Sequence, residues 1–274
     1  MTTMSTRRGF TLVELLIVMV ILGVVGAAIV RTLTTATRLS DSQSQRTAMQ
    51  GNLRAGAGLI PTELREINID ASGSDLIAIG KDSVKYRAMR RLAIACNGAT
   101  NVLVVRRTNS FGLTGFSAVS DSLFLYIEND PTLTSDDTWN KFAITSVSTG
   151  ACPDGSAATL LKLDANLPAG MVYDAPVRTY QVMTLKVYEA GGRKWLGVNV
   201  NDTGLQPVLG PLAAADSTFG FRDASGAVTA TPSSVRVIEA WLHGETEGKV
   251  SSGYNTRQFK QDSLRVRIRL RNAS

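Results

Sequence analysis

The N-terminal region of the sequence is dominated by an apolar run from Phe10 to Val30, in which Glu14 carries the only charge. As an α-helix rising about 1.5 Å per residue, this run is about 31 Å long, enough to cross the hydrocarbon core of a bilayer. Arg7 and Arg8 precede the run and Arg31 follows it, an arrangement that favours a cytoplasmic N-terminus. The run is also longer than the apolar core of an ordinary secretory signal. The sequence therefore predicts a membrane-spanning helix.

The carboxylate of Glu14 calls for a partner, because an ionised side chain costs on the order of 2.5 to 3.5 kcal/mol at the bilayer midplane and less near the edge. No basic residue lies within one helical turn inside the run. Cleavage after Gly9 would create an α-amino group on Phe10, and such a group is mostly cationic at neutral pH. It would lie about one turn from Glu14 in the same helix, and it could also pair with a neighbouring copy. The alternative is a Glu14 side chain that extends to the membrane interface.

A family resemblance follows from the residues at the start of the run, which read Arg7-Arg8-Gly9-Phe10-Thr11-Leu12-Val13-Glu14. Together with the unbroken apolar run, they resemble the N-terminal signal of type IV prepilins and type II secretion pseudopilins. The resemblance implies cleavage between Gly9 and Phe10 by a prepilin peptidase, followed by N-methylation of Phe10. It also implies that Glu14 meets the N-terminus of an adjacent subunit during filament assembly. Methylation retains the charge of the amine, so the charge pair persists.

The same arginine pair also resembles a twin-arginine export signal, in the segment Ser5-Thr6-Arg7-Arg8-Gly9-Phe10. Such signals usually have a shorter apolar core with a cleavage site beyond it. Here the core is long and contains Glu14, and Gly26-Ala27-Ala28 continues directly into further apolar residues. The pattern therefore favours the prepilin interpretation.

Beyond Arg31 the apolar positions become one-sided at helical spacing, which predicts an amphipathic helix. The sequence thus predicts a leader over residues 1–9 and one long helix over residues 10–67. Residues 10–30 would form the transmembrane or filament-core part, and residues 31–67 the amphipathic part. The recurring apolar positions of the second part are Met49, Leu53, Ala57, Ile60, Leu64 and Ile67.

From residue 68 to residue 274 the apolar period changes to two, which predicts strands. We expect one large antiparallel β-rich domain on which the helix packs, an α+β fold that fits the pilin plan. The predicted strands are Leu76–Ile79, Ser83–Ala88, Leu92–Cys96, Val102–Arg106, Leu123–Glu128, Phe142–Val147, Thr159–Leu163, Thr179–Tyr188, Lys194–Val200, Val235–His243 and Gln258–Arg271.

A second resemblance extends over the β-rich region, to PilW-type minor pilins and the related J-type pseudopilins. It implies a minor pilin of the bacterial inner membrane, with its β domain in the periplasm, that helps to initiate or cap a type IV pilus in a priming or tip complex. Its partners would be other minor and major pilins and the prepilin peptidase/methyltransferase. The alternatives are a J-type pseudopilin at a type II secretion tip and a pilus-tip adhesin or DNA-binding subunit. The segments that carry the resemblance are Gly210-Pro211-Leu212, Phe219-Gly220-Phe221-Arg222-Asp223, Val235–Leu242 and Leu270-Arg271-Asn272.

Cys96 and Cys152 are the two cysteines of the chain. An even number of cysteines in an exported domain favours a disulfide bond. Closing a loop of about 57 residues would stabilise the fold by roughly 4 kcal/mol in the chain-entropy model. The alternative is two unrelated thiols.

Arg265, Arg267, Arg269 and Arg271 alternate with aliphatic residues near the C-terminus. On a strand, this alternation places the four guanidinium groups on one face and the aliphatic side chains on the other. Three interpretations remain open for the arginine row: a solvated face that discourages edge aggregation, a contact with an acidic neighbour, and a site for nucleic-acid phosphates.

Residues suited to catalysis are scarce in the sequence. His243 is the sole histidine, and with two cysteines the chain lacks the ligand sets of most zinc sites. No nucleophile elbow, phosphate-binding loop, metalloprotease motif or calcium loop is present in the sequence. We therefore expect no enzymatic activity, no cofactor and no metal.

Overall fold

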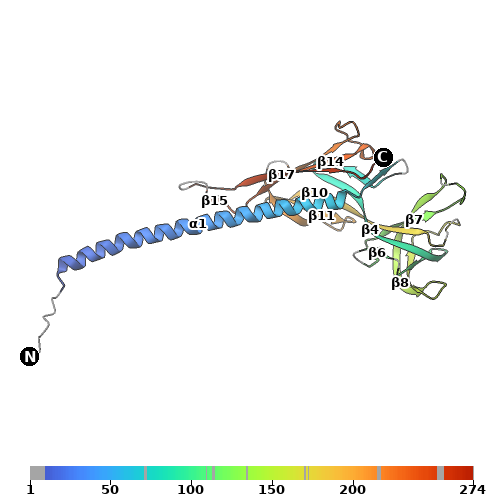
Figure 1. Ribbon diagram of the computed structural model, residues 1–274, viewed down its shortest axis with the longest axis horizontal. Coiled ribbons are helices and arrows are strands. Elements are labelled where there is room, and N and C mark those ends of the chain that lie inside the picture. Colours follow the sequence, from blue (N-terminus) through green and yellow to red (C-terminus); the bar gives the residue numbers. More distant parts are fainter. Residues whose placement is uncertain are drawn as a thin grey trace, which may run out of the picture.

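The computed structural model describes residues 10–70, 73–108, 110–112, 115–133, 135–169, 171, 173–214, 217–251 and 256–273. A long helix, α1 (Leu12–Leu64), projects from a β-rich body and packs on it with its C-terminal half (Figure 1). At about 1.5 Å per residue, α1 is about 80 Å long. The expected α+β architecture, an N-terminal helix on a large antiparallel sheet, is confirmed.

The described strands of the body are mostly antiparallel, whereas β1 and β18 form a short parallel pair. A 3₁₀ turn, η1 (Pro232–Ser234), precedes β14. The strands are β1 (Asn68–Asp70), β2 (Gly73–Ser74), β3 (Leu76–Ile79), β4 (Ser83–Ala99), β5 (Val102–Arg106), β6 (Phe111–Gly112), β7 (Ser122–Ile127), β8 (Thr138–Ala151), β9 (Ala157–Leu163), β10 (Pro176–Ala190), β11 (Arg193–Val200), β12 (Gln206–Leu212), β13 (Thr218–Arg222), β14 (Val237–Glu245), β15 (Val250–Ser251), β16 (Arg257–Gln258), β17 (Gln261–Arg269) and β18 (Asn272–Ala273).

The part of the body beside α1 is a sheet with the order β3-β4-β10-β11-β12-β14, in which β14 also pairs with β13 and β17. We call it the proximal sheet. The buried stripe of α1 packs against its inner face, and this contact forms one hydrophobic core. The stripe recurs every three or four residues between Met49 and Leu64, which is the spacing expected from the sequence. The described core members include Leu53, Ile60, Leu64, Leu185, Leu196, Leu209, Leu212, Ile238 and Leu242.

The far end of the body is a closed barrel. Its strands follow the order β4-β5-β9-β8-β7-β10, and β10 pairs with β4 to close the ring. The barrel has its own core, separate from the proximal one, and lies at the end of the molecule farthest from the N-terminus (Figure 1). The long strands β4 and β10 run through both parts and join them. The barrel core contains Leu103, Val105, Leu123, Leu125, Ile127, Phe142, Ile144, Leu161, Leu163 and Val177.

Candidate functional site

The N-terminus of α1 combines the residues that the sequence assigns to processing and assembly. Thr11 is the N-cap, and its hydroxyl oxygen accepts a hydrogen bond of 3.2 Å from the backbone N–H of Glu14. The carboxylate of Glu14 thus lies in the first helical turn, where the helix dipole favours a negative charge by about 0.3–1 kcal/mol in an exposed setting. Phe10 precedes the cap and is 80% exposed. Gly9 and the rest of the leader lie outside the described residues.

The apolar run of α1 has no packing partner among the residues that the structure describes. None of the most apolar window of the helix is buried, and α1 is long and apolar enough to cross a membrane by length and composition. Large side chains such as Leu12, Ile21 and Val30 are more than half exposed. An apolar surface of this extent must be covered by lipid or by other protein. The first part of the helix is therefore suited to a lipid or protein environment that the described residues do not supply.

Comparison with protein families decides what kind of N-terminus this is. Residues 4–30 match the model of the prokaryotic N-terminal methylation motif. The motif indicates a type IV pilin- or pseudopilin-like protein. It implies processing by a prepilin peptidase and assembly with other pilins, and it agrees with anchoring of the apolar helix in a membrane. The chain matched no curated protein and no solved structure.

The end of α1 is fixed to the body by a small polar cluster. The Glu63 carboxylate accepts hydrogen bonds from the Tyr86 hydroxyl (3.3 Å) and the Arg90 guanidinium (3.1 Å), both on β4. Burial of Tyr86 and the charge of Glu63 hold the pKa of the phenol well above its usual range. Because β4 continues into the barrel, this cluster links the membrane-proximal helix to both parts of the body.

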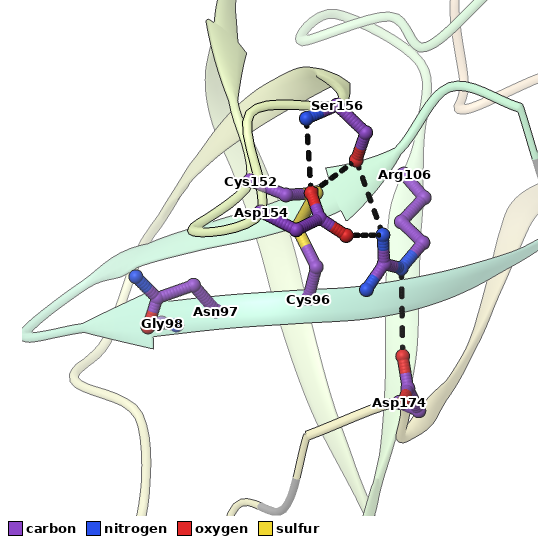
Figure 2. The surroundings of a disulfide bond; sticks show 8 residues. All are labelled: Cys96, Asn97, Gly98, Arg106, Cys152, Asp154, Ser156 and Asp174. Carbon is purple, nitrogen blue, oxygen red and sulfur yellow. Dashed lines mark hydrogen bonds and ion pairs between the residues drawn. A yellow bond between two sulfur atoms is a disulfide. The ribbon is translucent and has the colours of Figure 1, made fainter.

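A disulfide bond joins Cys96 and Cys152, as the sequence predicts (Figure 2). Cys96 lies on β4 and Cys152 directly follows β8. Both cysteines are buried and pack against Ala158 of β9. The bond therefore ties the β8–β9 hairpin to β4 within the barrel.

Polar side chains surround this bond (Figure 2). Arg106 of β5 forms ion pairs with Asp154, in the β8–β9 turn, and with Asp174, which precedes β10. Hydrogen bonds from the Ser156 hydroxyl and from Arg106 hold the pKa of Asp154 well below its usual range. These contacts stabilise the β8–β9 turn, which is a structural role.

The first three arginines of the row lie on β17 and face away from the core as expected, whereas Arg271 lies beyond the end of the strand. The row meets an acidic residue of the same chain. Arg265 (2.9 Å) and Arg267 (3.7 Å) contact the carboxylate of Glu239 on the neighbouring strand β14, and Arg222 of β13 contacts it from the other side (3.1 Å). Glu239 is only 1% exposed. Burial opposes its ionisation, but hydrogen bonds from Arg222 and Arg265 outweigh that effect and lower the pKa of Glu239.

The remaining members of the row differ in their surroundings. Arg271 lies 3.6 Å from the carboxylate of Glu66, just beyond α1, and Arg269 is exposed.

The sequence analysis did not single out Glu239, although one acid within the apolar segment Val-Ile-Glu-Ala-Trp-Leu is a detectable signal. Across the described part of the chain, no three His, Cys, Asp or Glu side chains gather as a metal site requires.

Proposed function

We propose that the protein is a minor pilin that helps to initiate or cap a type IV pilus within a priming or tip complex. The observation that carries this proposal is the exposed first part of α1, which is long enough to cross a membrane and bears the methylation motif. The other end of the helix packs on a bulky body with two parts. We place the protein in the bacterial inner membrane, with its N-terminus in the cytoplasm and its body in the periplasm before assembly.

The proposed mechanism is physical rather than catalytic. The apolar part of α1 leaves the bilayer for a filament core built from similar helices, so its exposed surface exchanges lipid for protein. In that core, the Glu14 carboxylate pairs with the α-amine of Phe10 in an adjacent subunit. The pairing offsets the desolvation of both charges, which would cost several kcal/mol for either one alone.

The shape of the body supports a role in few copies. The barrel extends the body well beyond the proximal sheet on which α1 packs (Figure 1). Close repetition along a filament requires bodies that fit side by side at the spacing set by their helices. A body with a second part is more easily placed once, at an end, where the barrel meets no following subunit.

Copy number and filament counts test this proposal. Quantitative mass spectrometry of sheared pili should find far fewer copies of this protein than of the major subunit. Deletion of its gene should reduce the number of pili per cell more strongly than their length. Equal abundance with the major subunit, or an unchanged number of pili in the deletion strain, would contradict the proposal.

Two alternative roles are distinguished by other observations. A J-type pseudopilin shares the same helix chemistry, and neighbouring secretion genes instead of pilus genes would favour it. DNA binding through the arginine row is less favoured, because Arg265, Arg267 and Arg271 each contact a carboxylate of the same chain. Phosphates would have to compete with those intramolecular ion pairs.

A further inference from the structure

A cleft of about 570 Å³ opens between the two parts of the body. One wall is the outer face of the barrel, formed by β7, β8 and β10, and the other is formed by the β1–β2 region and by β4 before it enters the barrel. Clefts at the junction of two structural units are preferred positions for ligand sites. The function proposed above assigns no role to this cleft.

The charged groups on the β4 side of the cleft are already paired. Arg87 donates a hydrogen bond of 2.7 Å to the carbonyl oxygen of Ser74 and lies 4.0 Å from the carboxylate of Asp75. Asp75 also accepts a hydrogen bond from the backbone N–H of Asn68. The β4 side of the cleft is therefore polar, and its positive and negative charges largely compensate one another.

The barrel side of the cleft carries two cations that lie over aromatic rings. The Arg178 guanidinium lies over the Trp139 ring at 4.9 Å, and the Lys141 ammonium lies over the Phe124 ring at 5.6 Å. Within the described residues, neither cation forms an ion pair with a carboxylate. Both side chains are exposed. The rings hold the two cations in place while their N–H groups stay available to an anion.

Neutral polar side chains on the barrel wall can bind hydroxyl groups. Thr138 and Asn140 of β8 line the cleft, and hydroxyl and amide groups both donate and accept hydrogen bonds. Asp137 also lines the cleft, but its Oδ1 atom is shielded from solvent and its other oxygen accepts a hydrogen bond from the Tyr126 hydroxyl. Contact with a ligand hydroxyl therefore falls to Thr138 and Asn140.

We propose that this cleft binds an acidic saccharide, with its anionic group on Arg178 and Lys141 and its hydroxyl groups on Thr138 and Asn140. A saccharide acid carries both kinds of group on one rigid ring. The anion would take charge-assisted hydrogen bonds from the two cations. Thr138 and Asn140 would exchange hydrogen bonds with the hydroxyl groups.

The same geometry disfavours single-stranded nucleic acid. Bases bind such proteins by stacking on free aromatic faces. Here Phe124 is contacted by Tyr180 (4.7 Å) in addition to Lys141, and Trp139 by Tyr126 (5.4 Å) in addition to Arg178. A saccharide acid binds through its carboxylate and hydroxyl groups and needs no free ring face.

Calorimetric titration of the full-length protein in detergent micelles tests the proposal. The probes are a tetramer of galacturonic acid, the matching neutral galactose tetramer, galacturonic acid itself and a short oligothymidylate. The acidic tetramer should bind at least tenfold more tightly than the neutral one. Comparison of the acidic tetramer with the monomer distinguishes a polymeric ligand from a single sugar acid. Loss of one charge-assisted hydrogen bond in Arg178→Gln or Lys141→Gln should weaken binding roughly tenfold to a hundredfold.

Lys249→Gln is the matched control, because Lys249 is also exposed and lies over a phenylalanine ring, Phe259, at 5.7 Å but outside the cleft. It should leave binding unchanged, and equal thermal unfolding of all variants would show that the fold is intact. Equal binding of acidic and neutral tetramers, no binding of either acid, or an equal loss in Lys249→Gln would overturn the proposal. Tighter binding of oligothymidylate than of the acids would also overturn it, in favour of a nucleic-acid site.

Discussion

At the scale of single residues, the account depends most on Glu14. We expect Glu14→Ala to be cleaved and methylated normally but to enter filaments at least tenfold less, because the amine of a neighbouring Phe10 then loses its partner. Breaking a buried ion pair by removing one member costs about 3–5 kcal/mol. Quantification of the variant in sheared filaments and in membranes measures both effects.

Asp41→Ala is the control for that substitution. Asp41 lies on the same helix beyond the apolar run, and its carboxylate accepts a hydrogen bond from Gln45. Its removal should change filament incorporation little. Normal incorporation of Glu14→Ala would argue against the charge pair.

Glu239 gives a prediction about pH. Its pKa is lowered in the folded protein, so it contributes stability above the ordinary glutamate range, and that contribution is lost as the pH falls through the lowered pKa. Glu239→Gln should therefore lower the free energy of unfolding by about 1–3 kcal/mol at pH 7. The difference from the wild-type protein should shrink below about pH 4.5 and vanish once Glu239 is protonated.

Denaturant unfolding of both proteins over a pH series measures this difference. Glu245→Gln serves for comparison, since Glu245 lies on the same strand and accepts a hydrogen bond from Gln261 instead of an arginine. It should show little effect at any pH. A Glu239→Gln deficit that stays constant down to acid pH would exclude the ionised cluster as its cause.

The roles of residues that belong to a local motif could be predicted from the sequence. The roles of residues that depend on partners distant in the chain could not. Phe10 and Glu14 belong to one short motif beside an apolar run, and the resemblance of that motif to prepilin signals identified them. Glu239 and Arg178 are isolated charged residues in the sequence. Their importance arises from arginines on β13 and β17 and from a cleft between two walls, which only the pairing of distant strands creates.

At the scale of elements, the contact between α1 and the proximal sheet depends on close packing at Gly56. A Cβ atom at Gly56 would lie 2.9 Å from a methyl carbon of Leu209, whereas nothing lies within 4 Å of the corresponding position at Gly58. Gly56→Val should therefore lower the free energy of unfolding by about 1–3 kcal/mol more than Gly58→Val. Because both variants place valine in the same helix, helix propensity cancels in the comparison.

Equilibrium unfolding in detergent, monitored by circular dichroism, measures the two variants. Equal stabilities would mean that α1 does not approach the sheet as closely as the structure has it. Gly58→Val also reports separately on the cost of a β-branched residue at an exposed helix position.

The elements differed in how far the sequence determined them. The helix and strands such as β5 follow regular apolar periods and were predicted well. The segments predicted as Ser83–Ala88 and Leu92–Cys96 are one strand, β4, because the chain passes from one core to the other while its pairing with β10 continues. Strands β12 and β13 were not predicted. Two prolines and a glycine interrupt the alternation in β12, and β13 has only five residues.

At the scale of the whole molecule, the sequence predicted one helix on one β-rich domain, and the structure divides that domain between two cores. The barrel was not predictable from periodicity, because its closure depends on pairing between β4 and β10, which are far apart in the chain. Alternation indicates which side chains face inward, but it does not specify the partner of each strand. The cleft could not be predicted for the same reason, since it lies where the two parts of the body meet.

The molecule combines a helix whose apolar first part is left uncovered by the described residues with a body extended away from the membrane end. The central claim is that maturation creates the positive charge that Glu14 requires. Intact-mass and N-terminal peptide analysis of protein extracted from membranes tests it most directly. The account predicts a mature chain that begins with N-methylated Phe10. Recovery of mature protein that still carries residues 1–9, or that begins beyond Val30, would contradict it.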